Sequence, residues 1–200
     1  MTRNRQTYWI DEQRQIAALA SPLRQEIVDV VTATGPCSIA RMAAALGRPP
    51  DRLYFHIRRL EAVGLLTQNG TVGNGRTAAA LYDVPGRPLR IRYDRRDKSR
   101  TRAIGAVHDG VLRLARRDLK RAMASARSVV NGPLRDTWGG RSRGWMTSTQ
   151  IRRLNRLIEQ MINLVRSGDA RKGAKPVAFT FVLAPPRQRP AKPKSIGVKK

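Results

Sequence analysis

The sequence has little of several residue types, and each shortage excludes a class of protein. One cysteine, Cys37, stands among 200 residues, so the chain cannot form an internal disulfide and lacks the thiolates of a cysteine-based zinc site. The two histidines, His56 and His108, lie far apart in the sequence, which leaves a soft-metal site almost without ligands. The acids are scattered singly and no Gly-rich phosphate loop is present, so we expect no enzyme, no metal and no cofactor.

Long apolar runs are also missing. None approaches the roughly 20 residues that a bilayer-spanning helix needs. The stretch MTRNRQTYWIDEQRQ at the start is charged where a signal peptide would need an apolar segment. We therefore expect a cytoplasmic protein that does not bind membranes, and an apolar content of 40% is enough for a packed core.

Acidic residues are few and basic residues are many. Forty Lys and Arg against fourteen Asp and Glu give a formal net charge of +26, which attracts polyanions, nucleic acid first. Residues 1–85 contain ten Arg and seven acids, a net +3, whereas the remainder contains thirty basic residues and seven acids, a net +23. Arg also outnumbers Lys by 32 to 8, which suits phosphate binding but is explained equally well by codon composition.

Residues 11–84 are predicted to form three helices followed by a hairpin. Apolar residues at helical spacing over 16–31 indicate the first helix, with Ser21 expected as its N-cap and Pro22 at its first helical position. The second, SIARMAAALG (38–47), begins with a capping serine and ends with glycine. The third runs over 50–63. Two Asn-Gly pairs within 65–84 then predict strand, tight turn and strand.

The helix over 50–63 has two different faces. On a helical projection Leu53, Ile57 and Leu60 share one inward stripe, and His56 lies near its edge. The remaining surface carries a set of charged and aromatic side chains: Asp51, Arg52, Tyr54, Phe55, Arg58 and Arg59. Arginine forks onto guanine or holds phosphate, and an apolar ring can meet a thymine methyl group. A solvated surface explains the arginines but leaves the aromatic ring among them unexplained.

The order of these elements is that of a winged helix-turn-helix. A short capped helix, a glycine turn, a second helix with a basic outer face and a hairpin follow one another, and in that fold the second helix of the motif reads bases. Arg48 lies in the turn before that helix. Arg76 lies just past the hairpin tip, where a wing holds phosphate or enters a minor groove, although a solvated turn residue explains it equally well. We therefore predict a mainly α fold with a small β-wing.

The rest of the chain is predicted to be helical with one or two strands. LRIRYD (89–94) alternates apolar and polar residues as a half-buried strand does. Apolar spacing predicts a long amphipathic helix over 103–127, and a capping box in MTSTQI begins another over 148–167. The segment 176–185 is typical of a β-strand with little polarity on either face.

These elements divide the chain into three parts. Residues 1–85 are expected to form the winged helix-turn-helix domain, 86–184 a helical region for dimerisation and effector binding, and 185–200 a disordered basic Pro/Lys tail. The apolar stripes of the two long helices are too wide for a three-helix core to cover, so we expect them to build a dimer interface. Trp138 and Trp145 either anchor their loop to the core or line an effector pocket.

Three stretches, LASPLRQEIVDVV, SIARMAAALGRPPDRLYFHIRRLEAVGLL and the hairpin after them, resemble the winged-helix DNA-binding domain of ArsR-type bacterial transcription regulators. The resemblance covers residues 11–84, and the later helices with PVAFTFVLAP are similar to longer members that lack a metal site. It implies a homodimer that binds an inverted-repeat operator in double-stranded DNA, usually as a repressor relieved by a ligand or a modification. Its partners would be DNA at the nucleoid, a second copy of the chain and a small-molecule effector of unknown identity.

Two positions depart from that family. Metal-sensing members carry Cys-x-Cys at the start of the first motif helix, where this chain has 38–40 (Ser-Ile-Ala), so metal sensing is not expected. Pro49 and Pro50 stand where members commonly have a capping Ser or Thr. Pro50 suits the first helical position, and Asp51 is expected to meet the positive end of the helix dipole.

Two alternatives stay open. An architectural protein could bind DNA or RNA without sequence preference through the half that carries +23. Cys37, immediately before the cap of a helix, is either inert or a redox sensor whose thiol pKa is lowered by the helix N-terminus.

Overall fold

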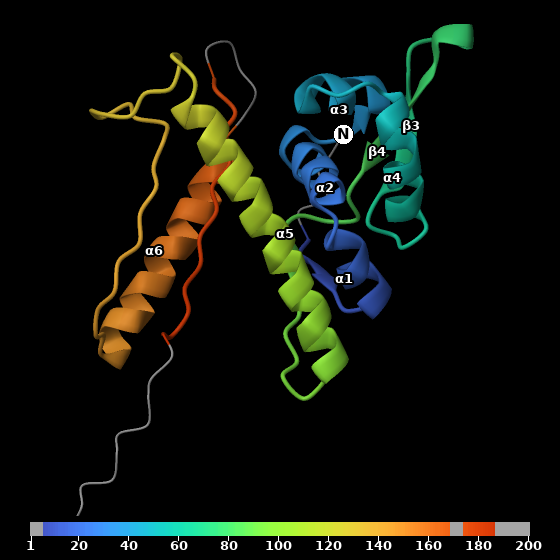
Figure 1. The fold of residues 1–200 in the computed structure, drawn as a ribbon. Coiled ribbons are helices and arrows are strands. Elements are labelled where there is room, and N and C mark those ends of the chain that lie inside the picture. Colours follow the sequence, from blue (N-terminus) through green and yellow to red (C-terminus); the bar gives the residue numbers. More distant parts are fainter. Residues whose placement is uncertain (1–5, 169–173, 187–200) are drawn as a thin grey trace, which may run out of the picture.

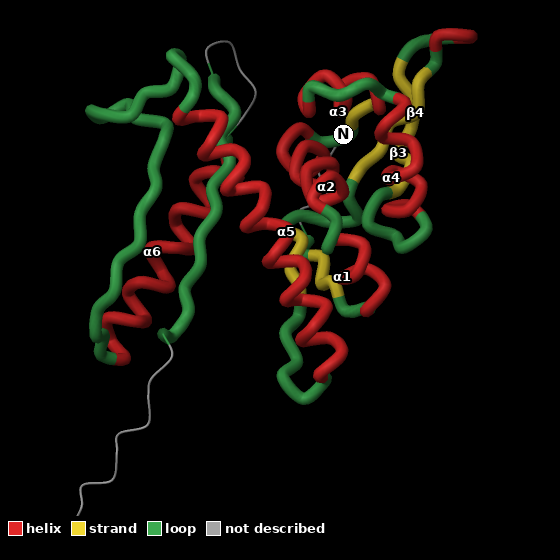
Figure 2. Tube along the Cα trace, in the orientation of Figure 1, coloured by secondary structure: helices red, strands yellow, loops and turns green. Residues whose placement is uncertain are grey.

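The computed structural model describes residues 6–168 and 174–186, which contain six α-helices and two small sheets (Figures 1 and 2). The elements up to the hairpin are β1 (Tyr8–Ile10), α1 (Gln13–Leu19), α2 (Pro22–Thr34), β2 (Cys37–Ser38), α3 (Ile39–Leu46), α4 (Asp51–Glu61), β3 (Thr67–Val72), the 3-10 turn η1 (Gly75–Thr77) and β4 (Ala79–Asp83). The later elements are β5 (Leu89–Ile91), α5 (Lys98–Met123) and α6 (Ser148–Ser167). The predicted mainly helical fold with a small β-hairpin is confirmed.

α2 begins at Pro22 after Ser21, as predicted, but the apolar residues before Ser21 belong to a separate helix, α1, so the expectation of three helices before the hairpin is wrong. The chain is extended at Ser21, with φ −83° and ψ 121°, and α2 begins at Pro22. Proline lacks an N–H and its ring clashes with a preceding helical turn, so it begins a helix but does not continue one. The Ser21 side chain makes no capping hydrogen bond. Across the break, Arg24 Nε donates to the carbonyl of Ala18.

The turn between α3 and α4 follows the predicted signals. Ser38 Oγ accepts a hydrogen bond from the N–H of Arg41 at 3.3 Å and caps α3. Gly47 ends α3 in the left-handed region, with φ 59°, which glycine adopts without steric cost. Pro50 has helical dihedral angles but precedes α4 by one residue, and Asp51 lies in the first turn. This short turn fixes the direction in which α4 leaves the motif.

Both sheets include a strand that the sequence did not predict. The expected hairpin of β3 and β4 is extended by β2 in the order β2-β4-β3, with neighbouring strands antiparallel. β5 is shorter than the predicted 89–94 and pairs in parallel with β1, Tyr8 opposite Leu89. At the hairpin tip Gly73 has φ +87°, and a Cβ there would lie 2.9 Å from the carbonyl oxygen of Thr77.

One core holds α1 to α4 and the first half of α5 together. Its fully buried members come from every element of the motif and from the segment after α4: Ile16, Ile27, Val31, Met42, Leu53, Ile57, Leu60, Leu65 and Leu66. Ile104 and Val107 of α5 belong to the same cluster. The core therefore continues beyond residue 85, and α5 begins as part of the helix-turn-helix scaffold.

The C-terminal part contains two long helices, α5 and α6. α5 begins at Lys98, five residues before the predicted start, because the Asp97 side chain caps it by accepting from the N–H of Arg100 at 2.9 Å. It ends at Met123 rather than at 127. α6 forms as predicted, with the capping box of Thr147 and Gln150. In Figure 1, α5 runs between the α1–α4 group and α6, and α6 buries none of its residues.

The sequence makes separate predictions for the segment 176–185, the two tryptophans and the tail. The strand predicted over 176–185 is wrong, since 174–186 is exposed and contains no strand; a strand needs neighbouring backbone to pair with, and here none does. Anchoring by the tryptophans is also wrong, because Trp138 is 68% and Trp145 is 92% exposed, which equally removes them from an enclosed pocket. The tail predicted over 185–200 lies outside the described residues from 187 onward. Within the described ranges, no helix combines the length and apolarity needed to cross a bilayer.

Candidate nucleic-acid interface

The inner face of α4 is fixed to the core as the helical projection predicts. Leu53 and Leu60 are fully buried and Ile57 is 1% exposed. His56 is half-buried at the edge of this stripe. Three core contacts spaced over two turns determine which face of α4 looks outward.

The outer face of α4 is exposed over its whole length. Phe55 is 65% exposed, and its ring makes a T-shaped contact with the ring of His56, at 5.4 Å between centroids. Tyr54 is 47% exposed. The charged residues predicted for this face are exposed as well: Asp51, Arg52, Arg58 and Arg59. α4 therefore presents one continuous face that combines cations with an uncovered aromatic ring.

The two predicted arginines outside α4 lie on the loops that flank it. Arg48 is exposed in the turn before α4, with its side chain at 39% of full exposure, and its Nη2 lies 3.7 Å from Oε2 of Glu26 in α2. Arg76 lies in η1, the 3-10 turn between β3 and β4. Figure 1 shows the hairpin of β3 and β4 projecting beyond α4 at one end of the molecule, as a wing does.

Positive charge surrounds the inner edge of α4. Burial lowers the pKa of His56, and the nearby charges of Arg24 and Arg48 lower it further, so this imidazole is neutral at pH 7. Its Nδ1 is buried and has no hydrogen-bond partner among the described residues. The pKa of Arg24 is lowered by burial and then by the charge of Arg59. Arg24 thus belongs to the basic surroundings of α4, which sequence reasoning missed because α2 and α4 come together only in the fold.

A buried glutamine holds the far end of α4. Gln15 of α1 is 3% exposed, and its Nε2 donates to the carbonyl of Val63 at 2.9 Å and to the hydroxyl of Tyr8 at 2.8 Å. A buried amide left without partners would cost free energy, so these bonds fix the segment just after α4.

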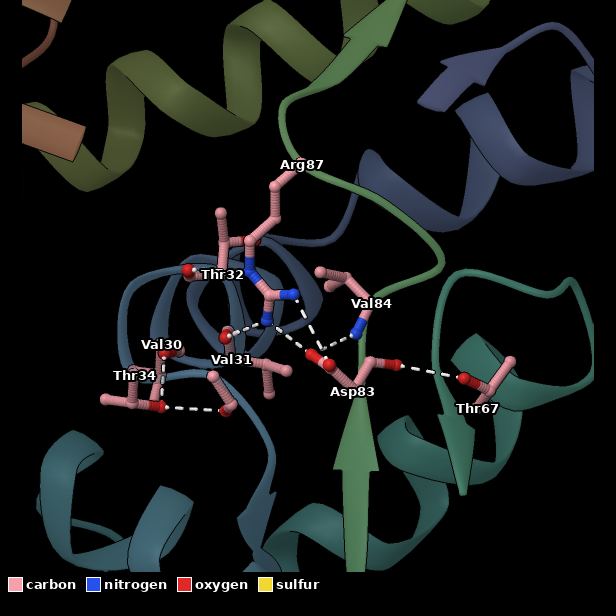
Figure 3. Close-up of polar contacts among 9 residues, drawn as sticks. Val30, Val31, Thr32, Thr34, Thr67, Asp83, Val84 and Arg87 are labelled. Carbon is pink, nitrogen blue, oxygen red and sulfur yellow. Dashed lines mark hydrogen bonds and ion pairs between the residues drawn. The ribbon is translucent and has the colours of Figure 1, made fainter. Parts of the chain in front are cut away.

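A buried ion pair holds the base of the wing to α2 (Figure 3). Arg87 pairs with Asp83 at the end of β4, and both side chains are about nine-tenths buried, at 12% and 10% exposure. The same guanidinium donates from Nη2 to the carbonyl of Val31 at 2.9 Å and from Nε to that of Thr32 at 3.1 Å. Asp83 also accepts from the N–H of Val84 at 2.8 Å.

This arrangement satisfies the last carbonyls of α2 with a cation and places β4 beside them. No sequence pattern predicts this ion pair, since Arg87 is one of 32 arginines and its carbonyl partners lie more than 50 positions away.

The reactive-thiol alternative for Cys37 is not supported. Cys37 is 1% exposed, and burial raises the pKa of its thiol, which outweighs the lowering by Thr34 and by nearby arginines. The alternative of a thiol pKa lowered by the helix N-terminus is therefore wrong. Among residues 6–168 and 174–186, no three His, Cys, Asp or Glu side chains lie close enough to hold a metal ion.

Comparison with known proteins places α4 inside a matched domain. Residues 19–69 match the model of a Helix-turn-helix domain, which spans α2, α3 and α4 and ends within β3. Domains of this kind occur in ArsR-type regulators and are typical of DNA-binding, non-enzymatic proteins. Comparison with curated proteins finds no match. This chain therefore contains a helix-turn-helix domain, and α2, α3 and α4 are the helices that lie within it.

Proposed function

We propose that the chain is a sequence-specific transcriptional regulator, a repressor of the ArsR type, that places α4 in the major groove of double-stranded DNA. The observation that carries the proposal is the exposed Phe55 among arginines on the outer face of α4, a helix inside the matched helix-turn-helix domain. Water alone is a poor environment for an uncovered phenyl ring, whereas a thymine methyl group in the groove would cover it.

The residues of this face have separate roles in the proposal. Arg52, Arg58 and Arg59 fork onto guanine or hold phosphate, and Phe55 meets a thymine methyl. The remaining members of the site contact the backbone or neighbouring base edges: Arg48, Asp51, Tyr54 and Arg76. Phosphate contacts set the register on the duplex and base contacts set the sequence, so the two groups predict different mutant behaviour.

The proposed regulator acts as a homodimer on an inverted repeat. α6 buries no residue within its own chain, yet Leu157, Met161 and Leu164 on it are 46%, 41% and 74% exposed. A 20-residue amphipathic helix gains most of its stability from packing, so a second copy that covers α6 and the second half of α5 would stabilise both. This region would also respond to a small-molecule effector, and the protein would work in the cytoplasm at the nucleoid.

Selection from a random pool of duplex DNA tests the proposal. The purified chain should enrich an inverted repeat whose half-sites are about one helical turn apart, because a two-fold dimer presents two α4 helices. Sedimentation should give a dimer at micromolar concentration. A monomer there would contradict the homodimer.

A second candidate is sequence-independent binding of DNA or RNA by the basic C-terminal half. It is favoured by the arginines that are exposed on α6 and the loop before it: Arg135, Arg141, Arg143, Arg152, Arg153 and Arg156. Both candidates predict binding that weakens with salt. Binding that enriches no motif in the selection would favour this second candidate.

A further inference from the structure

Three charged side chains connect α5 to the turn before α4. Glu26 lies on α2, Arg117 lies in the second half of α5, and Arg48 lies between α3 and α4. Arg117 Nη2 donates to Glu26 Oε1 at 2.7 Å. On the other oxygen of the same carboxylate, Oε2, Arg48 Nη2 lies 3.7 Å away, beyond hydrogen-bond distance.

Glu26 needs a cation, because only 14% of its side chain is exposed. A carboxylate removed from water is unfavourable unless it is paired and hydrogen-bonded. Arg117 supplies the hydrogen bond, and that bond is the main cause that raises the pKa of Arg117. Oε2 has no hydrogen-bond partner among the described residues. Glu26 therefore has one strong partner and one weak partner.

The weak partner belongs to the proposed DNA interface. While Arg117 compensates Glu26, the long ion pair to Glu26 is the only salt bridge of Arg48 among the described residues, so a phosphate could replace it. If Arg117 leaves, Arg48 is the cation nearest to an uncompensated carboxylate, and Glu26 would hold it with full hydrogen bonds. Phosphate and Glu26 then compete for one guanidinium.

Arg117 lies outside the part of α5 that belongs to the buried core. The buried residues of α5 are Ile104, Val107 and Gly110, all in its first half. The half that follows packs less closely and leads toward α6. A change in the packing of this second half, by a second copy or an effector, would therefore move Arg117 relative to Glu26.

We infer that Glu26 and Arg117 are positioning residues for Arg48, and that through them the second half of α5 controls how well the helix-turn-helix domain binds DNA. The inference rests on the proposed function, in which Arg48 holds a phosphate.

A double-mutant cycle on DNA affinity tests the inference, measured by fluorescence anisotropy with a duplex that the full chain selects. Arg117→Gln should weaken binding about fivefold, the upper range for a partly exposed ion pair. Arg48→Gln should weaken binding and reduce the slope of log affinity against log salt by about one. The double variant should bind no more weakly than Arg48→Gln alone. Glu26→Gln, which removes the competitor, should bind at least as tightly as the unchanged chain.

Two further variants separate this effect from loss of charge and from misfolding. Arg116→Gln removes the same charge from an exposed neighbour with no ion pair in the described part of the chain, and it should weaken binding less than Arg117→Gln does. Arg117→Lys keeps a cation beside Glu26 and should retain most of the affinity. Thermal unfolding curves identify any variant that has lost its fold.

The possible failures are distinguishable. If Arg117→Gln weakens binding by the same factor in the Arg48→Gln background, or no more than Arg116→Gln does, the coupling is overturned while the proposed function stands. If Arg48→Gln leaves both affinity and salt slope unchanged, Arg48 holds no phosphate and the inference falls with that contact. If the unchanged chain selects no sequence, the proposed function itself fails.

Discussion

The buried pair of Arg87 and Asp83 allows a quantitative test of how the wing is attached. Replacing Arg87 with Met removes the cation and its bonds to the carbonyls of Val31 and Thr32, but keeps much of the side-chain volume. Asp83 is 7% exposed, and in this variant its carboxylate would still accept the hydrogen bond from the N–H of Val84.

The expected loss follows from that geometry. Removing one partner of a buried pair costs about 3–5 kcal/mol, and the bond that Asp83 retains places Arg87→Met near the lower end, about 3 kcal/mol. For a chain of this size that loss corresponds to a fall in Tm of about 6–12 °C. Far-UV circular dichroism during urea and thermal unfolding measures both quantities.

The double variant Asp83→Asn with Arg87→Met is the matched control. It leaves no charge buried, so it should be about 1–2 kcal/mol more stable than Arg87→Met alone. A loss below about 1 kcal/mol in the single variant, or a double variant less stable than the single one, would refute the view that this pair holds the wing to α2.

Three further predictions follow from the same structure. Leu53→Ala should destabilise the chain by about 2–5 kcal/mol, whereas Phe55→Ala on the opposite face should change stability by less than about 0.5 kcal/mol; urea unfolding compares the two. Cys37 should react slowly with iodoacetamide at pH 8 in the folded chain and rapidly in urea, since it is buried and the pKa of its thiol is raised. Mass spectrometry follows the adduct. Fast labelling of the native chain would contradict the raised pKa. The pKa of His56 is lowered by folding, so as pH falls the unfolded chain takes up a proton at this site before the folded chain does. The free energy of unfolding should therefore fall as pH drops below about 6.5. His56→Gln should lose less of that free energy between pH 7 and 5.

The sequence was sufficient to predict features that depend on residues close together in the chain, such as helix faces and helix ends. The period of Leu53, Ile57 and Leu60 determined the inner face of α4, because burial on a helix repeats every three or four positions. Ser38, Gly47 and the Thr147 capping box mark helix ends through groups within a few positions. The burial period alone therefore predicted which residues of α4 face outward, without knowledge of the residues that pack against its inner face.

Features that depend on distant residues were not predictable. β1 pairs with β5 across about 80 positions, and Arg87 finds its carbonyls across more than 50, so neither leaves a pattern in a short window. The segment 176–185 has the composition of a strand but forms none, because pairing requires another backbone beside it. Glu26 reads as one acid on a helix, and its two arginine partners become visible only when α2, α5 and the turn before α4 are assembled.

Repeating the random-duplex selection with Phe55→Ala measures whether the outer face of α4 reads DNA sequence. The variant should select the same inverted repeat with one thymine preference relaxed in each half-site, while the other positions are retained. A motif identical to that of the unchanged chain, at the same affinity, would show that Phe55 lies outside the interface and would contradict the proposed placement of α4.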